Sequence, residues 1–185
     1  KKRGTIAYAD IPFLKQSLEI CDIIRSDPNS QWYEKLRSPN TKPKMAPETT
    51  ISEKGFADSL KPLIGPRMSP FHSATAQETA DVLTKWWSAW AAKCPQPFQP
   101  YNPAGNHPND YVIQQNIGTQ SLNKLLAKLH NDFHLPILNL QQSDFEKLID
   151  IKDFTEDPEW QKGIGYWSKF GTNQKSFDDV SEEML

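Results

Sequence analysis

The segment from Thr75 to Pro95 constrains the fold most, because the start, the apolar face and the end of one long helix can all be read from it. Thr75 and Glu78 fit a capping box, in which the hydroxyl and the carboxylate each accept a hydrogen bond from a free backbone amide. The apolar positions that follow are Val82, Leu83, Trp86, Trp87, Trp90, Ala91 and Cys94. Pro95 and Pro97 end the helix. Three tryptophans on adjoining faces are either deeply buried or form an aromatic surface, and we expect burial.

Further helices are predicted where apolar residues recur at helical spacing between suitable end signals. The segments are 10–26, 52–63, 117–129 and 143–149, and the last structured piece is expected over 157–170. Asp10, Ser52 and Ser143 each carry a side-chain oxygen that can accept a hydrogen bond from the first turn of a helix. Two shorter pieces are ambiguous: Ser30 could start a short helix, and residues 111–113 fit either a short strand or a helix start.

Fifteen prolines against eight glycines indicate rigid connectors rather than flexible tethers. The longest connectors are 38–47 and 95–110. We therefore expect a mainly α fold, a compact bundle of five or six helices with long proline-rich connectors and little room for a sheet. In this prediction residues 1–175 form a single helical domain, as a fragment of a longer protein because the chain starts at Lys1, and residues 176–185 form an acidic tail.

The cysteine content and the hydropathy pattern indicate the compartment. Cys21 and Cys94 are expected to be reduced and buried, because a chain of 185 residues can bury a large core without covalent staples. No apolar run approaches the roughly 18 residues that a membrane span needs, and no signal peptide is present. These features predict a cytoplasmic protein with no membrane partner.

Motifs for catalysis or metal binding are weak. His130 and His134 have a spacing that can hold zinc, but the glutamate and the third ligand that such sites use are missing. The acidic residues within 178–183 lie near a charged chain end, not in the rigid cleft that catalytic carboxylates need. Gly163-Ile164-Gly165 lacks the third glycine of a dinucleotide site. We predict no catalytic residue, cofactor or metal ion here, with an enzyme domain with a dispersed active site as an alternative.

Positive charge is concentrated toward the amino-terminal end of the chain. Residues 1–70 carry 12 Lys/Arg and 8 Asp/Glu, whereas residues 141–185 carry 5 and 11. Positive groups neutralise phosphates and aromatic rings stack on bases, so this basic region is a candidate DNA-binding face; the alternative is an ordinary solvated surface. The predicted DNA-binding residues are Arg25, Trp32, Tyr33, Lys35, Arg37, Lys42, Lys44, Lys61 and Arg67, and Lys1, Lys2 and Arg3 are further candidates.

Several stretches, taken in order, resemble the DGQHR-domain family. The segment 11–37 ends in Ser26-Asp27-Pro28-Asn29-Ser30-Gln31-Trp32-Tyr33-Glu34-Lys35-Leu36-Arg37 and is similar to the region that follows the signature motif of that family. Segment 51–63 resembles the next helix. Segment 80–94, the proline-rich loop and segment 111–122 resemble the C-terminal helices. The Asp-Gly-Gln-His-Arg pentapeptide that names the family is absent and would lie upstream of Lys1.

This family includes the DNA phosphorothioation regulator DndB and relatives in bacterial restriction and phage-defence loci. The resemblance implies a DNA-linked role, namely the helical, non-catalytic part of a DNA-modification regulator that contributes DNA contact or protein association. The main alternative is a helical protein-interaction module that docks a partner through the Trp86/Trp87/Trp90 face or the proline-rich loop. Salt-dependent DNA binding, weakened by Lys35→Glu plus Arg37→Glu, would separate the two.

Overall fold

The computed structural model describes residues 10–65, 69–105, 107–150 and 156–185, and within these ranges the chain is mainly helical, as predicted. The α-helices in these ranges are α1 (Asp10–Ser26), α2 (Glu53–Ser59), α3 (Lys61–Ile64), α4 (Ala76–Lys93), α5 (Asn116–Asn131), α6 (Gln142–Asp150), α7 (Asp157–Trp160) and α8 (Gln174–Glu183). This set of eight exceeds the expected five or six for two reasons. Pro62, which cannot donate a backbone hydrogen bond, divides the segment 52–63 into α2 and α3, and the acidic end folds as α8.

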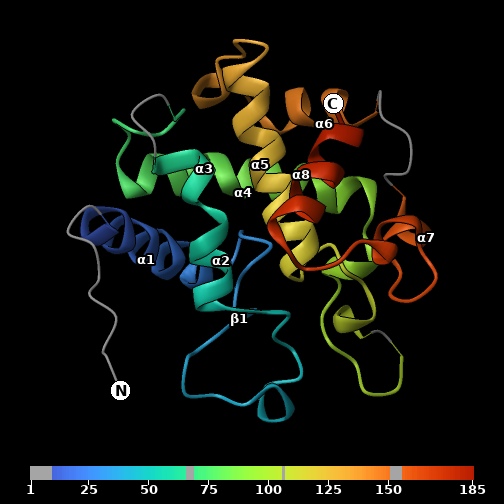
Figure 1. The fold of residues 1–185 in the computed structure, drawn as a ribbon. Coiled ribbons are helices and arrows are strands. Elements are labelled where there is room, and N and C mark those ends of the chain that lie inside the picture. Colours follow the sequence, from blue (N-terminus) through green and yellow to red (C-terminus); the bar gives the residue numbers. More distant parts are fainter. Residues whose placement is uncertain (1–9, 66–68, 106, 151–155) are drawn as a thin grey trace.

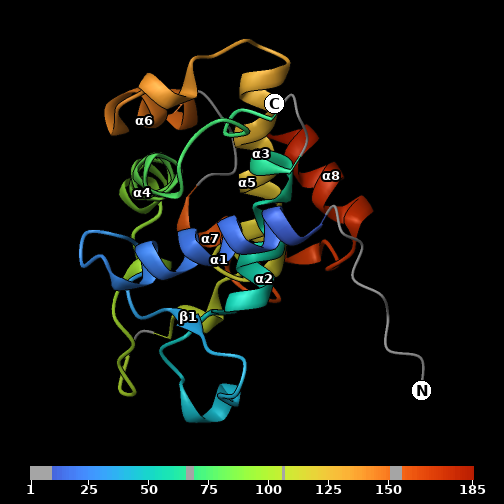
Figure 2. The same ribbon diagram turned by 90° about the vertical axis from the view of Figure 1, so that its left-hand side faces the viewer.

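Helices α4 and α5 form the centre of the fold (Figure 1). Helix α4 packs against α1 and α6, whereas α5 packs against α2, α3 and α8. Figure 2 shows α6 next to α4 and α8 next to α5, so the two partners cover different sides of the central pair. Short 3-10 helices mark the connectors: η1 (Pro43–Met45), η2 (Gln96–Phe98), η3 (Pro108–Asp110), η4 (Ile137–Asn139) and η5 (Tyr166–Lys169).

The ends of the predicted helices follow local chemistry. The Thr75 hydroxyl accepts a hydrogen bond from the Glu78 amide at 3.2 Å, and a Glu78 carboxylate oxygen accepts from the Thr75 amide at 2.8 Å, which confirms the capping box of α4. Ser52 caps α2 by accepting from the Gly55 amide. The prediction that Ser143 caps α6 is wrong, because α6 begins at Gln142 and Ser143 lies inside it.

The tryptophans fill the core, as expected from the pattern of α4. Trp86, Trp87 and Trp90 are at most 1% exposed. Trp32 is fully buried, and its ring meets Phe56 and Trp87 edge to face with ring centres 4.7 and 4.8 Å apart. The alternative in which an exposed face of these three α4 tryptophans binds a partner is therefore contradicted.

The segment after Ser30 forms turns and then a strand, so the predicted short helix is absent from this part of the structure. The Ser30 hydroxyl accepts from the Trp32 amide, and Glu34 adopts a φ of 55°, which helical residues do not. Strand β1 (Leu36–Arg37) then pairs in parallel with β2 (Ile51–Ser52). Tyr111 forms an isolated antiparallel bridge with Gln161, and the chain then turns over residues 112–115 before α5, so residues 111–113 are neither a strand nor the start of the helix.

Residues 176–183, within the segment 176–185 that was predicted as an acidic tail, are part of α8, which ends at Glu183. The apolar side chains Phe177, Val180 and Met184 of this segment recur at helical spacing and are buried. Beside this buried face, Asp178 pairs with Lys124 and Glu182 pairs with Lys128, and both lysines belong to α5. The acidic residues of this segment therefore help to hold α8 against α5, and they do not make the chain end fray.

Candidate functional site

The predicted DNA-binding residues do not gather into one patch. Arg25 is committed to ion pairs, with Asp22 at 2.6 Å and with Glu53 at 3.3 Å. Trp32 lies in the core and exposes no ring face for a base to stack on. Tyr33 is 40% exposed. Lys42 and Lys61 are exposed, on the 38–47 connector and on α3. The side chain of Lys44, together with Arg67, Lys1, Lys2 and Arg3, lies outside the described residues.

Lys35 points inward. Its ammonium donates hydrogen bonds to the Phe98 carbonyl oxygen at 2.8 Å and to Gln114 Oε1 at 3.4 Å, and it lies over the Phe98 ring. Burial without an acidic partner lowers the pKa of this amine to about 8. Lys35 therefore joins the β1 region to the proline-rich loop and is not presented to a polyanion. A Lys35→Glu variant would test the packing of this region rather than DNA contact.

Arg37 is the predicted residue that opens into a polar pocket. This pocket, which we call the Arg37 pocket, has a volume of about 390 Å³. Its lining residues are Arg37, Thr50, Ile51, Ser52, Asn109, Val112, Gln115, Asn116, Ile117, Lys162, Ser168, Phe170 and Thr172. The lining contains two cationic side chains and no aspartate or glutamate. A concave surface with this charge distribution attracts anions.

The two cationic side chains come from distant parts of the chain. Arg37 is held by the pairing of β1 with β2, where it lies opposite Ser52. Lys162 is fixed by its backbone amide, which donates to the Asp110 carbonyl oxygen at 2.7 Å. Neither side chain forms an ion pair with any acidic residue in the described ranges. Both charges are therefore available to a ligand in the pocket.

The amino-terminal end of α5 contributes positive potential to the same pocket. Gln115 precedes the helix but does not cap it, because its side-chain amide donates to the Asn109 carbonyl oxygen at 2.8 Å instead. The first turn of α5 contains no acidic residue. The backbone amides of Asn116 and Ile117 and the dipole of this 16-residue helix therefore face the pocket without a protein anion to neutralise them.

Gly118 brings the preceding chain against the first turn of α5. Its amide donates to the Val112 carbonyl oxygen at 3.2 Å. A β-carbon at this position would lie 2.2 Å from the Ile113 carbonyl oxygen, which is far inside contact distance. Only glycine permits this close approach, so Gly118 sets the position of the helix start in the pocket.

Thr50 provides an independent indication that the pocket has a polar occupant. Its side chain is 7% exposed, and its Oγ1 atom is buried with no hydrogen-bond partner in the described part of the chain. A buried hydroxyl without a partner is costly, by roughly 1–3 kcal/mol. Since Thr50 lines the pocket, a bound anion or its hydration shell can supply the missing partner.

Sequence reasoning found Arg37 but missed the other members of this site. Lys162 stands alone in its segment, beside the Gly163-Ile164-Gly165 turn, and no basic cluster marks it. The polar residues at 115 and 116 gave no signal either, because an uncapped helix start is not visible in the sequence. The residues of the site lie far apart in the sequence, so their residue types alone do not indicate that they share a pocket.

The metal and cysteine candidates do not form a second site. Helix α5 ends at Asn131, so His130 and His134 do not share a continuous helix, and His130 Nδ1 contacts the Leu135 carbonyl oxygen at 2.9 Å. No cluster of three metal-binding side chains occurs among the described residues. Cys21 and Cys94 are buried free thiols, and burial raises the pKa of Cys21 to about 12.

Comparison with protein-family models, with curated proteins and with solved structures finds no match for this chain. In the part of the chain that the structure describes, no helix has both the length and the apolar character to cross a membrane.

Proposed function

We propose that this chain is the helical, non-catalytic part of a DNA-modification regulator, acting in the bacterial cytoplasm, and that it contacts the DNA backbone through the Arg37 pocket. The observation that carries the proposal is the convergence of Arg37, Lys162 and the uncapped start of α5 on a pocket whose lining has no carboxylate. Phosphate oxygens are the ligands that guanidinium, ammonium and free helix amides share.

Two further features support DNA over a small anion. The resemblance of segments 11–37, 51–63 and 80–122 to the DGQHR-domain family favours a DNA-linked role in regulation or phage defence. Lys42 and Lys61 add exposed positive charge outside the pocket, and an extended polyanion can use such scattered charges, whereas a single phosphate cannot. Backbone contact without base contact predicts binding with little sequence preference.

The test is the salt dependence of binding to a fluorescent DNA duplex. We expect measurable affinity at low salt, and we expect Arg37→Gln plus Lys162→Gln to weaken it about tenfold or more. The slope of log affinity against log salt should fall by about 1.8 in this double variant, since each lost phosphate contact removes roughly 0.9.

The matched control is Lys15→Gln plus Lys147→Gln, which removes the same charge from exposed lysines on α1 and α6 that belong neither to the pocket nor to the predicted DNA-binding residues. It should change the affinity much less. An equal loss in both double variants would show that binding depends on diffuse charge and would remove the pocket from the proposal. Absence of DNA affinity at low salt would overturn the DNA role as a whole.

A further inference from the structure

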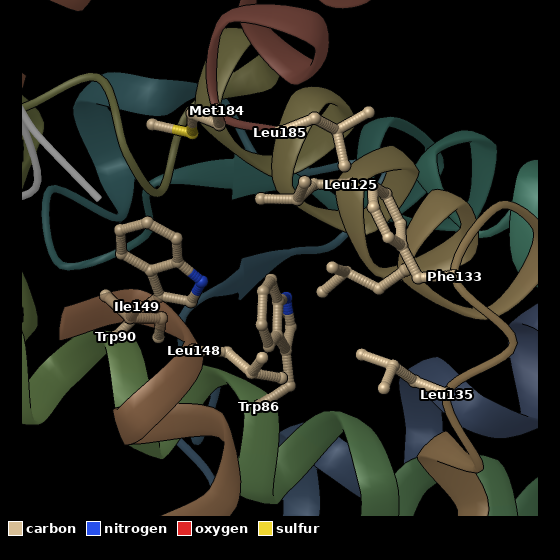
Figure 3. Close-up of a pocket in the computed structure, with 10 residues that line it drawn as sticks. Trp86, Trp90, Leu125, Phe133, Leu135, Leu148, Ile149, Met184 and Leu185 are labelled. Carbon is tan, nitrogen blue, oxygen red and sulfur yellow. The ribbon is translucent and has the colours of Figure 1, made fainter. Parts of the chain in front are cut away.

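A second pocket lies along the carboxyl-terminal half of α5, whereas the Arg37 pocket lies at the start of this helix, and the lining of the second pocket is apolar. It has a volume of about 230 Å³. The lining residues, drawn in Figure 3, are Trp86, Trp90, Leu125, Leu129, Phe133, Leu135, Leu148, Ile149, Met184 and Leu185. They come from α4, α5, α6, the chain after α5 and the chain end after α8. We call this space the tryptophan pocket.

Two hydrogen-bond donors are buried in this apolar lining without partners. Trp86 and Trp90 are each 1% exposed, and neither indole nitrogen has a hydrogen-bond acceptor among the described residues. Trp87, the neighbour of Trp86 on the same helix, differs because its indole nitrogen donates to Asn123. Buried indole N–H groups usually find an acceptor. The indole nitrogens of Trp32 and Trp160 are also buried without a partner among the described residues, but neither lines this pocket. At the pocket itself, the two unpartnered donors point to an acceptor supplied by a ligand.

Trp86 is the donor best placed to meet a ligand. The rings of Trp86 and Trp90 are nearly perpendicular, with centres 5.8 Å apart. Figure 3 shows the Trp90 nitrogen on the ring edge that faces Trp86, whereas the Trp86 nitrogen lies on the side of its ring toward Phe133 and Leu135. An acceptor in the space between Trp86 and these two side chains can receive the Trp86 hydrogen bond.

We propose that the tryptophan pocket binds a small, neutral, mostly apolar molecule that carries one acceptor oxygen, such as a ketone or an ester, and that Trp86 donates a hydrogen bond to that oxygen. Binding is favoured because the apolar lining removes the hydrocarbon part of the ligand from water. A hydrogen bond from the Trp86 indole N–H to the ligand removes the free-energy cost of a buried donor without an acceptor. A ligand obtains both contributions to binding only if one molecule carries an apolar part and an acceptor oxygen.

The charge of the ligand follows from the lining. No charged side chain lines the pocket, and the nearby ammonium of Lys128 is paired with Glu182. A carboxylate would lose its hydration without gaining a cation, which is unfavourable. The size also limits the choice, because an apolar cavity of about 150 Å³ accommodates benzene, so this pocket suits a molecule of one substituted ring.

The test uses two probes of nearly the same shape, acetophenone and α-methylstyrene, which differ in whether the side group ends in a carbonyl oxygen or a methylene carbon. Titration is followed by the indole N–H signals of the full chain labelled with nitrogen-15. We expect acetophenone to bind roughly fivefold more tightly than α-methylstyrene, as one net hydrogen bond gives. We also expect it to move the Trp86 signal downfield, with benzoate failing to bind.

Two variants separate the pocket from other sites. Trp86→Phe keeps a ring but removes the donor, so it should abolish the preference for acetophenone while α-methylstyrene binds as before. Leu135→Trp fills the pocket from a partly exposed position, so it should remove binding of both probes without emptying the core. The proposal is overturned if neither probe binds the wild type, if both bind equally, or if either probe still binds Leu135→Trp unchanged.

Discussion

The indole nitrogen of Trp87 donates a hydrogen bond to Asn123 Oδ1 over 3.2 Å and thereby joins α4 to α5. The amide nitrogen of the same asparagine donates to the Ser59 hydroxyl at 2.8 Å, at the end of α2. All three side chains are fully buried. One asparagine therefore connects three helices inside the core, and it fixes how the tryptophan face of α4 meets α5.

Replacing Asn123 by leucine should destabilise the fold by about 2–4 kcal/mol. The substitution keeps the volume but leaves the Trp87 N–H buried without an acceptor, which is more costly than the loss of the hydrogen bond alone. Urea unfolding followed by tryptophan fluorescence measures the change. Asn139→Leu, at an exposed position, is the control and should stay within about 0.5 kcal/mol. Equal stability of the two variants would contradict the role of Asn123.

The predictable part of the fold is the part that local chemistry determines. The limits of α4 follow from the Thr75 and Glu78 side chains and from Pro95, which act on their own turn of the chain. The register of its tryptophans also followed from sequence spacing, and their burial is confirmed. The end of the chain was different. There the acidic composition led to the prediction of a tail, although the spacing of Phe177, Val180 and Met184 predicts a helix, which the structure has.

The candidate site was less predictable because it depends on tertiary contacts. Lys35 and Arg37 are two residues apart, yet one points toward Phe98 and Gln114 while the other opens into the pocket. Residues two apart in a strand point to the same face, but β1 covers only Leu36–Arg37, so Lys35 lies in the turn before the strand and does not follow this alternation. The partner cation, Lys162, is brought in by the Asp110 contact. Residue type marked these side chains as cationic, but only the fold decides which of them meets solvent.

Gly118→Ala should destabilise the protein by about 3 kcal/mol or more, although alanine is normally the better helix former. The added methyl would lie 2.2 Å from the Ile113 carbonyl oxygen, so the start of α5 must move. Thermal unfolding by circular dichroism measures the loss. Gly105→Ala is the control, because the nearest atom to its β-carbon lies at an ordinary 3.6 Å. A Gly118→Ala variant as stable as the wild type would show that the close approach is not required.

Val180→Asp should release α8 from α5. Val180 is fully buried, and an unpaired carboxylate in its place cannot stay in the core. Hydrogen exchange should then become fast in residues 174–183 and in the face of α5 that they cover. Lys175→Asp, which places the same side chain at an exposed position of the helix, should leave exchange slow. Fast exchange of these residues in the wild type would instead support the acidic tail that the composition suggested.

The buried amine of Lys35 should make stability rise with pH. Its pKa is about 8 in the folded chain, below the ordinary value of 10.5, because burial disfavours the charged form. The unfolded chain therefore binds more protons between these two pH values, and the free energy of unfolding rises as pH increases through this window. Below pH 8 the full penalty persists. The gain across the window is about 3 kcal/mol.

The measurement is the difference in urea stability between the wild type and Lys35→Met from pH 7 to about 10.5. Taking the difference matters because Cys21, with a pKa raised to about 12, acts in the opposite direction at high pH and is present in both proteins. Lys54→Met, which removes an exposed lysine, is the control for the loss of one positive charge. A flat difference for Lys35→Met would contradict burial of the amine.

Pyrophosphate should stabilise the wild type through the Arg37 pocket, independently of any duplex. A ligand that binds only the folded state raises the free energy of unfolding with its concentration, and each tenfold increase above the dissociation constant should raise Tm by roughly 4 °C. Arg37→Gln should abolish most of this shift because it removes a bidentate donor, whereas Lys61→Gln should leave it intact.

Thr50→Val tests the role of the buried Thr50 hydroxyl in the same site. It should stabilise the free protein, since the buried Oγ1 atom has no partner among the described residues, and it should weaken the pyrophosphate shift. Stabilisation of the free protein with an unchanged shift would separate Thr50 from the ligand, and an equal Tm shift in wild type and Arg37→Gln would remove the anion site itself.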